Sequence, residues 1–261
     1  MQSWRIDLAW DGANYCGWQQ QPHGRSIQVE VERALSKLFG GESIVASAAG
    51  RTDAGVHAMQ QIVSFEAKAP REAHKVQKGL SALLPNDIVC VHAEKMPEGF
   101  QARWASKRKL YRYRVLSHPI RDPLRLGRVW WLRDEIDVSI LQSEGQYFIG
   151  RHDFSSFRAT RCTARSVIRT VESFRVERCG DELVFEVIGK GFLRHQVRIM
   201  VGTLIDIARR NLINIGIKDI LKKCDRRCAG ITAPAHGLYL VWTELKDLEK
   251  DEFLDCGLDN D

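Results

Sequence analysis

The sequence contains no run of about 18 uncharged apolar residues, the length that a membrane-spanning helix needs. Its first residues, MQSWRIDLAWDG, place Arg5, Asp7 and Asp11 where a secretory signal peptide has its apolar core. The 261 residues are 44% hydrophobic and 28% charged, which is typical of globular domains and atypical of disordered or fibrous chains. We therefore expect a cytoplasmic protein without membrane contact that folds around one or two cores.

Several catalytic signatures are also missing. The sequence has no phosphate-cradling glycine loop, no Rossmann or kinase signature, no nucleophile-elbow serine and no helical H-E-x-x-H pair. Seven scattered cysteines suit free thiols in a reducing compartment better than a disulfide framework. Cys224 and Cys228, with His236 downstream, lack the usual zinc spacing and a fourth ligand. We expect neither a metal site nor a cofactor.

The net charge of +6 is unevenly distributed along the chain. From Glu244 to the end, eight acidic and two basic residues give a net charge of −6, so residues 1–243 carry +12. A basic body attracts polyanions, among which nucleic acid is the default candidate. The acidic end is expected to be a solvated, flexible tail.

The hydrophobic pattern of the first hundred residues alternates between the strand period and the helix period. It predicts a strand at 5–10, a helix starting after the N-cap Ser26, strands over 43–50 and 56–67, a helix over 70–84 with Pro70 in its first turn, and a strand over 87–96. This order of strand, helix, two strands, helix and strand is the split βαβ arrangement of an α+β domain.

A similar order begins again at Lys107. It comprises a strand over 107–118, a helix at 136–150, a hairpin of 167–177 and 182–190, a strong helix over 192–210, a short helix at 217–224 and a last strand over 238–245. The first of these helices is expected to be capped by Asp137 and to turn Ile140, Leu141, Tyr147 and Phe148 inward. The strong helix is expected to bury Leu193, Val197, Leu204 and Ala208. We predict an α+β fold of two similar βα-ββ-αβ domains with antiparallel sheets, residues 1–104 and 105–245, followed by the tail 246–261.

The most unusual stretch is the polar loop A-G-R-T-D-A-G-V-H at residues 49–57. Gly50 and Gly55 allow a sharp turn, and the flanking strands would hold Arg51 and Asp53 at a fixed position. Spacing alone leaves two interpretations open. Asp53 is an active-site carboxylate beside a cation, or it closes an ordinary Asx-turn while Arg51 is solvated.

Three further features bear on RNA binding. Tyr111 lies in the basic strand KRKLYRYRV, among Lys107, Arg108, Lys109 and Arg112, and is either a stacking platform for a nucleobase or an ordinary strand tyrosine. His195 and Arg198 are expected to share a face of the long helix, where they form a reactive pair or a solvated polar stripe. Residues 152–169 interleave phenylalanines with arginines, as RNA-contacting loops do and other basic loops do as well.

The string AGRTDAGVHA closely resembles the signature of the TruA family of tRNA pseudouridine synthases. Further matches follow in the family's order: DGANYCGWQQQP, SKRKLYRYRV, GRHDFSSFRA, FLRHQVRIMVGTL and AHGLYLVWTEL, which together span residues 11–245. Trp10 and Cys16 depart from the pattern, at positions that we expect to lie away from the chemistry. The resemblance implies an isomerase that converts uridine to pseudouridine in the anticodon stem-loop of tRNA, at positions 38, 39 and 40.

The resemblance also implies site residues and an assembly. Asp53 would be the catalytic carboxylate, Arg198 its ion-pair partner, Tyr111 the ring stacked on the target base, and Arg51 an aid to base extrusion. The two domains would join their sheets into one, with the helices on one side and a basic cleft between the domains, and the protein would be a homodimer.

Two other functions stay open. A noncatalytic RNA-binding protein would have Asp53 exposed outside any basic pocket, and a glycosidase-like hydrolase would need a second carboxylate partner.

Overall fold

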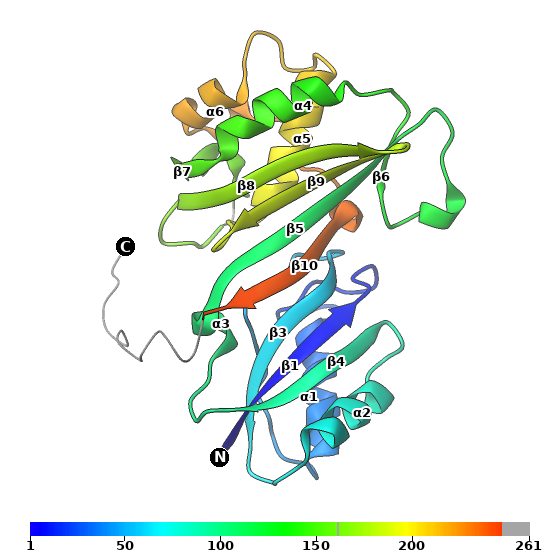
Figure 1. Cartoon of the computed structure of the whole chain (residues 1–261), viewed down its shortest axis with the longest axis vertical. Coiled ribbons are helices and arrows are strands. Elements are labelled where there is room, and N and C mark those ends of the chain that lie inside the picture. The colour runs from blue at the N-terminus through cyan, green and yellow to red at the C-terminus, as the bar shows by residue number, and fades with distance from the viewer. Residues whose placement is uncertain (161, 247–261) are drawn as a thin grey trace.

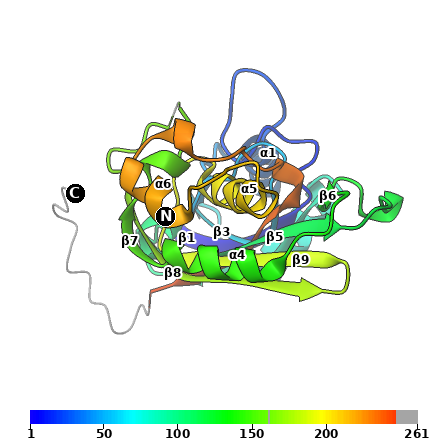
Figure 2. The same cartoon turned by 90° about the horizontal axis from the view of Figure 1, so that it is seen from above.

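The structure is a computed structural model that describes residues 1–160 and 162–246. A single sheet with strand order β4-β1-β3-β10-β5-β9-β8-β7 runs the length of the molecule (Figure 1). Helices α1, α5 and α6 lie together on one side of it (Figure 2). The predicted α+β fold with a joined sheet is confirmed. In this part of the chain, no helix is both long and apolar enough to cross a bilayer.

The first half follows the predicted order. Its elements are β1 (Gln2–Trp10), α1 (Ile27–Leu38), β2 (Ser47–Ala48), β3 (His57–Ala67), α2 (Ala73–Leu83) and β4 (Ile88–Met96). Strand β1 pairs antiparallel with both β3 and β4. Helix α1 buries Ile27, Val31 and Leu35 at a spacing of four residues, so one apolar stripe packs onto the core.

The second half contains more elements than predicted. They are α3 (Ala102–Ala105), β5 (Ser106–Ser117), β6 (Trp130–Leu132), α4 (Val138–Gly145), β7 (Gly150–Asp153), β8 (Ile168–Cys179), β9 (Glu182–Gly189), α5 (Gln196–Ala208), α6 (Ile217–Lys223) and β10 (Leu238–Leu245). The sequence analysis did not predict α3, β6 or β7, because segments of three or four residues are too short to show a period.

The two halves join through β10. This strand pairs antiparallel with β5, and its first residues pair in parallel with the first residues of β3, Tyr239 with His57 and Leu240 with Ala58. The main core fills the space between sheet and helices. A smaller cluster of Ala49, Ile62, Met96, Phe100 and Ala102 lies apart from it and ties α3 to the first residue of the polar loop.

Several local expectations are wrong. Ser26 precedes α1 in an extended conformation, but its side chain makes no capping hydrogen bond. Pro70 lies before α2, which begins at Ala73. The strand expected at 43–50 shrinks to β2. Tyr147 is 45% exposed rather than inward, because α4 ends at Gly145 and a tighter 3₁₀ turn follows.

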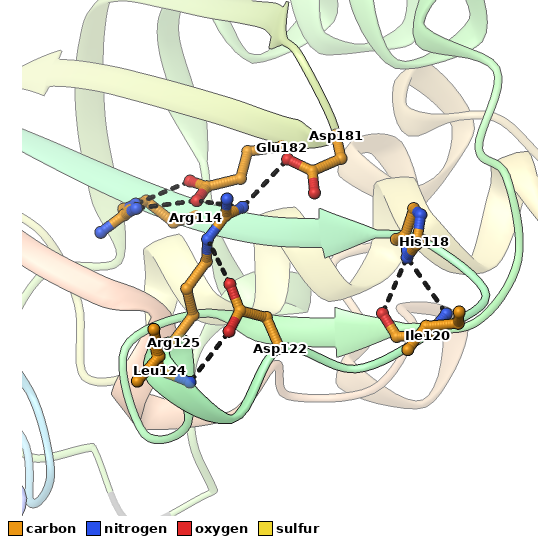
Figure 3. Close-up of polar contacts among 8 residues, drawn as sticks. All are labelled: Arg114, His118, Ile120, Asp122, Leu124, Arg125, Asp181 and Glu182. Atoms are coloured by element: carbon orange, nitrogen blue, oxygen red, sulfur yellow. Dashed lines mark hydrogen bonds and ion pairs between the residues drawn. The ribbon is translucent and has the colours of Figure 1, made fainter.

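The long connection between β5 and β6 is held by polar contacts. Arg125 pairs with Asp122, Asp181 and Glu182, and Glu182 also pairs with Arg114 on β5 (Figure 3). Asp122 accepts a hydrogen bond from the backbone N–H of Leu124. The connection is therefore fixed to the turn between β8 and β9, at the end of the sheet distant from α3.

Candidate active site

Asp53 lies on the loop between β2 and β3, and its side chain is 25% exposed. One carboxylate oxygen is 3.9 Å from Arg198 Nη1, and the other is 3.8 Å from His195 Nε2. Both distances exceed a hydrogen bond, so the Arg198 guanidinium and the His195 imidazole face the carboxylate without being directly bonded to it. The turn is closed by the backbone carbonyl of Asp53, which accepts a hydrogen bond from Val56 N–H, rather than by an Asx contact of its side chain.

The motif DGANYCGW packs directly behind this loop. A Cβ on Gly12 would lie 2.1 Å from the carbonyl oxygen of Val56, and one on Gly17 would lie 2.5 Å from that of Thr52. Gly17 also has a φ of +101°, which a side chain would strain. These two glycines let the N-terminal segment touch the loop backbone, which explains their positions in the motif.

Hydrogen bonds complete this contact. Trp18 N–H donates to the carbonyl of Thr52, Gly55 N–H donates to that of Tyr15, and the indole of Trp10 donates to that of Val56 at 3.1 Å. Trp10 therefore supports the loop that carries Asp53 through the loop backbone. The backbone around Asp53 is held on both sides, which fixes its carboxylate.

Arg198 on α5 is partly fixed by the protein itself. Its side chain is 13% exposed, and Nε donates a 2.8 Å hydrogen bond to the carbonyl of Ala233. Burial lowers the pKa of the guanidinium and the charge of Asp53 opposes this shift. The remaining N–H groups of the guanidinium are thus available on the side that faces Asp53.

His195 is misplaced by the sequence analysis. It precedes α5 as the N-cap residue with a left-handed φ of 63°, and Leu193 also lies before the helix. The side chain nevertheless reaches Asp53 together with Arg198. Burial lowers the pKa of the imidazole, and Asp53 opposes that shift. The left-handed turn at His195 brings its imidazole towards Asp53, and a sequence pattern of helical spacing cannot predict such a turn.

Tyr111 on β5 is buried and faces the main core. Its ring meets Phe192 edge to face, with centroids 5.3 Å apart. Burial raises the pKa of its hydroxyl above the usual value, and the nearby charge of Asp53 adds to this. The hydroxyl therefore stays protonated at neutral pH. Arg51 is exposed on the loop two residues before Asp53, at a position open to a ligand.

Lys109 shares the covered face of β5 with Tyr111. It is only 6% exposed, and Nζ donates to Ser106 Oγ at 2.7 Å. A Cβ on Gly50 would lie 3.0 Å from Lys109 Cε, so the lysine stem runs under the loop. The sequence analysis grouped Lys109 with its basic neighbours around Tyr111, although those at 108 and 112 lie on the other face.

His57 marks the junction of the halves. It lies 2.9 Å from Asp11, which also pairs with Arg128, and its Nε2 is 3.2 Å from the carbonyls of Gly127 and His236. Its ring stacks on Tyr239 of β10. His57 ends the polar loop A-G-R-T-D-A-G-V-H, and this position in the sequence gives no sign of its contacts with distant residues.

In residues 1–160 and 162–246, no three His, Cys, Asp or Glu side chains are grouped as metal ligands. Six cysteines are free in this part of the chain, and Cys256 lies outside it.

The sequence of this chain is similar to those of known proteins. A family model described as tRNA pseudouridine synthase matches residues 9–105 and 145–244. The tRNA pseudouridine synthase A 1 of a Bacillus cereus strain is 40% identical over 236 residues, which cover 90% of this chain and 96% of that protein. The tRNA pseudouridine synthase A of Moorella thermoacetica is 43% identical over 242 residues, covering 92% and 98%.

Among solved structures, a chain from the crystal structure of a Cbf5-Nop10-Gar1 complex aligns with a TM-score of 0.36 and 13% identity. The alignment covers 90% of this chain and 57% of that one. The sequence relatives carry the assignment: the chain belongs to the TruA family of tRNA pseudouridine synthases, isomerases that act on tRNA.

Proposed function

We propose that this protein converts uridine to pseudouridine in the anticodon stem-loop of tRNA, at positions 38, 39 and 40, with Asp53 as the catalytic carboxylate. The observation that carries the proposal is the position of Asp53 on a loop held from behind, facing Arg198 and His195, with Tyr111 nearby. A noncatalytic RNA-binding protein would have no use for this arrangement.

The reaction is an isomerisation. The bond between N1 of uracil and C1′ of ribose breaks, a bond between C5 and C1′ forms, the proton leaves C5, and N1 ends protonated. No electron is gained or lost overall, so the reaction needs no oxidant or reductant. Attack on the ring, attack on the sugar and removal of a sugar proton all start from the carboxylate of Asp53, which faces Arg198.

The base must leave the helical stack before it can rotate, which costs a few kcal/mol and costs least in a loop or at a stem end. Tyr111 would hold the detached uracil against its ring, and Arg51 would fill the vacated space. The exposure of Arg51 and the fixed ring of Tyr111 support these roles.

The test uses full-length tRNA and an isolated anticodon stem-loop, with pseudouridine mapped after incubation. Asp53→Asn keeps the size of the side chain but removes its charge, so turnover should fall by at least about 10³-fold while tRNA affinity changes little. Asp134→Asn, an exposed acid elsewhere, is the matched control and should behave as wild type. Product formation by Asp53→Asn above a small percentage of the wild-type rate would reject the assignment.

Two organisational proposals accompany this function. We propose domains at residues 1–104 and 105–245, with a boundary that falls at the end of α3, between β4 of the first half and β5 of the second. We also propose that two copies form a homodimer, as the family resemblance implies. Sedimentation equilibrium of the free protein tests the dimer, and a monomer at micromolar concentration would contradict it. The acidic tail lies outside the described residues beyond Lys246.

A further inference from the structure

Trp104 presents its indole to solvent from α3, the helix that packs against the first residue of the polar loop. It is 71% exposed, whereas four of the six other tryptophans contribute to the packed core or its edge and Trp131 is 40% exposed. Single exposed apolar residues are common on protein surfaces and need no explanation by themselves. The residues around Trp104 nevertheless indicate a binding role for its indole.

The first observation is a cation held against the ring. The guanidinium carbon of Arg103 lies 5.4 Å from the centroid of Trp104. Arg103 pairs with no carboxylate within residues 1–160 and 162–246, in contrast to Arg108 close by, which pairs with Glu172 and Glu244. An exposed aromatic ring beside an unneutralised arginine is the combination with which proteins stack and clamp unpaired nucleic-acid bases.

The second observation is the position of α3. Ala102 and Ala105 pack against Ala49, the residue that begins the polar loop, and Ala102 N–H donates to Ser64 Oγ at 3.0 Å. Helix α3 lies at the start of β5 (Figure 1). This packing leaves Arg103 and Trp104 on the outer side of α3, on the same flank of the molecule as the start of the polar loop.

The third observation is a run of positive charge that links α3 to the loop. Arg103 is close enough to Lys109 to lower the pKa of its ammonium group, in addition to the larger effect of burial. The stem of Lys109 in turn lies against Gly50. An RNA strand whose target base enters beside Asp53 would meet the exposed Arg51 and Arg103, with the buried charge of Lys109 beneath the loop between them.

We propose that Arg103 and Trp104 form a second stacking site, which holds an unpaired base of the RNA substrate outside the catalytic pocket. The inference rests on the proposed function, since it takes RNA as the ligand. The indole supplies a flat apolar face that any base can cover, and Arg103 supplies a contact to the adjoining phosphate. The site adds binding energy and takes no part in the chemistry.

The test compares three variants of the full chain with full-length tRNA. Trp104→Ala should weaken binding by about 5- to 140-fold, the effect of losing one stacked base. Trp104→Phe keeps a ring and should retain most of the affinity. Trp131→Ala is the matched control, because Trp131 pairs with Leu116 near the far end of β5, roughly 30 Å from α3, and should bind as wild type.

Two further measurements make the result decisive. The single-turnover rate of Trp104→Ala at saturating tRNA should equal that of wild type, because only binding is affected, and circular dichroism should show an intact fold. Binding within twofold of wild type, or an equal loss in Trp131→Ala, would overturn the stacking site. A change in sedimentation of Trp104→Ala without loss of tRNA affinity would also overturn it, by assigning the indole to a protein contact. Failure of the wild-type chain to form pseudouridine would instead reject the proposed function.

Discussion

Strand β5 carries basic side chains on both faces, and their partners differ. On the open face, Arg112 lies directly opposite Glu186 and pairs with it, and Arg114 pairs with Glu182. On the covered face, the hydrogen-bond acceptors of Lys109 in the described part of the chain are the Ser106 hydroxyl and, at 3.5 Å, the carbonyl of Lys190. Strand β5 thus pairs the arginines of its open face with carboxylates and leaves the buried Lys109 of the covered face without one in the described part of the chain.

The physical costs of the two faces are opposite. Cross-strand ion pairs in contact with solvent require little desolvation and contribute roughly 0.2–1 kcal/mol each to the free energy of unfolding. A buried ammonium group without a carboxylate is expensive, and such a group persists mostly where function requires it. Because Lys109 runs under the loop of Asp53, the comparison predicts that the paired charge stabilises the sheet and that the unpaired charge of Lys109 serves the substrate.

Lys109→Met should have the largest effect and tests this comparison directly. Burial, with a contribution from Arg103, lowers the pKa of Lys109 from 10.5 to about 8. Below pH 8 the folded protein bears the full cost of the buried charge. Between pH 8 and 10.5 the folded state releases its proton before the unfolded state does, so the free energy of unfolding rises with pH. Methionine removes a cost of up to about 3 kcal/mol at pH 7.

Urea unfolding at pH 7 and about pH 9.5, inside that window, measures the effect. Wild type should gain stability between the two values, and Lys109→Met should be more stable at pH 7 and gain less. Its tRNA affinity or single-turnover rate should fall, since the retained charge serves the substrate. Lys107→Met, an exposed lysine paired with Glu244, is the matched control without either effect. Full activity in a stabilised Lys109→Met would show that the charge has no function.

Substitution of Tyr111, the next residue on the covered face, should have a smaller effect on the single-turnover rate, and this effect should depend on whether the aromatic ring is kept. Burial and the charge of Asp53 raise the pKa of its hydroxyl, which makes it a weaker acid and favours stacking over proton transfer. Tyr111→Phe should therefore retain near-normal single-turnover rates, while Tyr111→Leu should lose about 1–3 kcal/mol of base stabilisation. Equal losses in both variants would assign proton transfer to the hydroxyl. Normal rates in both would remove Tyr111 from the site.

The sequence predicts this face of β5 better than it predicts its surroundings. The alternation in YRYRV places Tyr111 and Tyr113 on one side and the arginines on the other, as the structure confirms. The same alternation places Lys109 on the tyrosine face, but the elements that cover it have no local signal, because Gly50 and Lys190 are distant from it in the chain. Spacing could not show the left-handed turn at His195 either, nor the parallel pairing of β10 with β3 that joins the halves. Local periodicity predicts which residues face inward, while long-range pairing decides what they meet.

Arg112→Ala should have the smallest effect and completes the comparison from the open face. The pair with Glu186 is partly exposed, so its loss should destabilise the protein by only about 0.5 kcal/mol, measured by urea unfolding at neutral pH. If the open face serves the sheet alone, the dependence of tRNA affinity on salt should match wild type, because no phosphate contact is lost. Arg103→Ala beside Trp104 should instead reduce the log–log salt slope by roughly 0.7 to 0.9, one phosphate contact. A reduced slope in Arg112→Ala would place RNA on the open face and end the distinction between the two sides of β5.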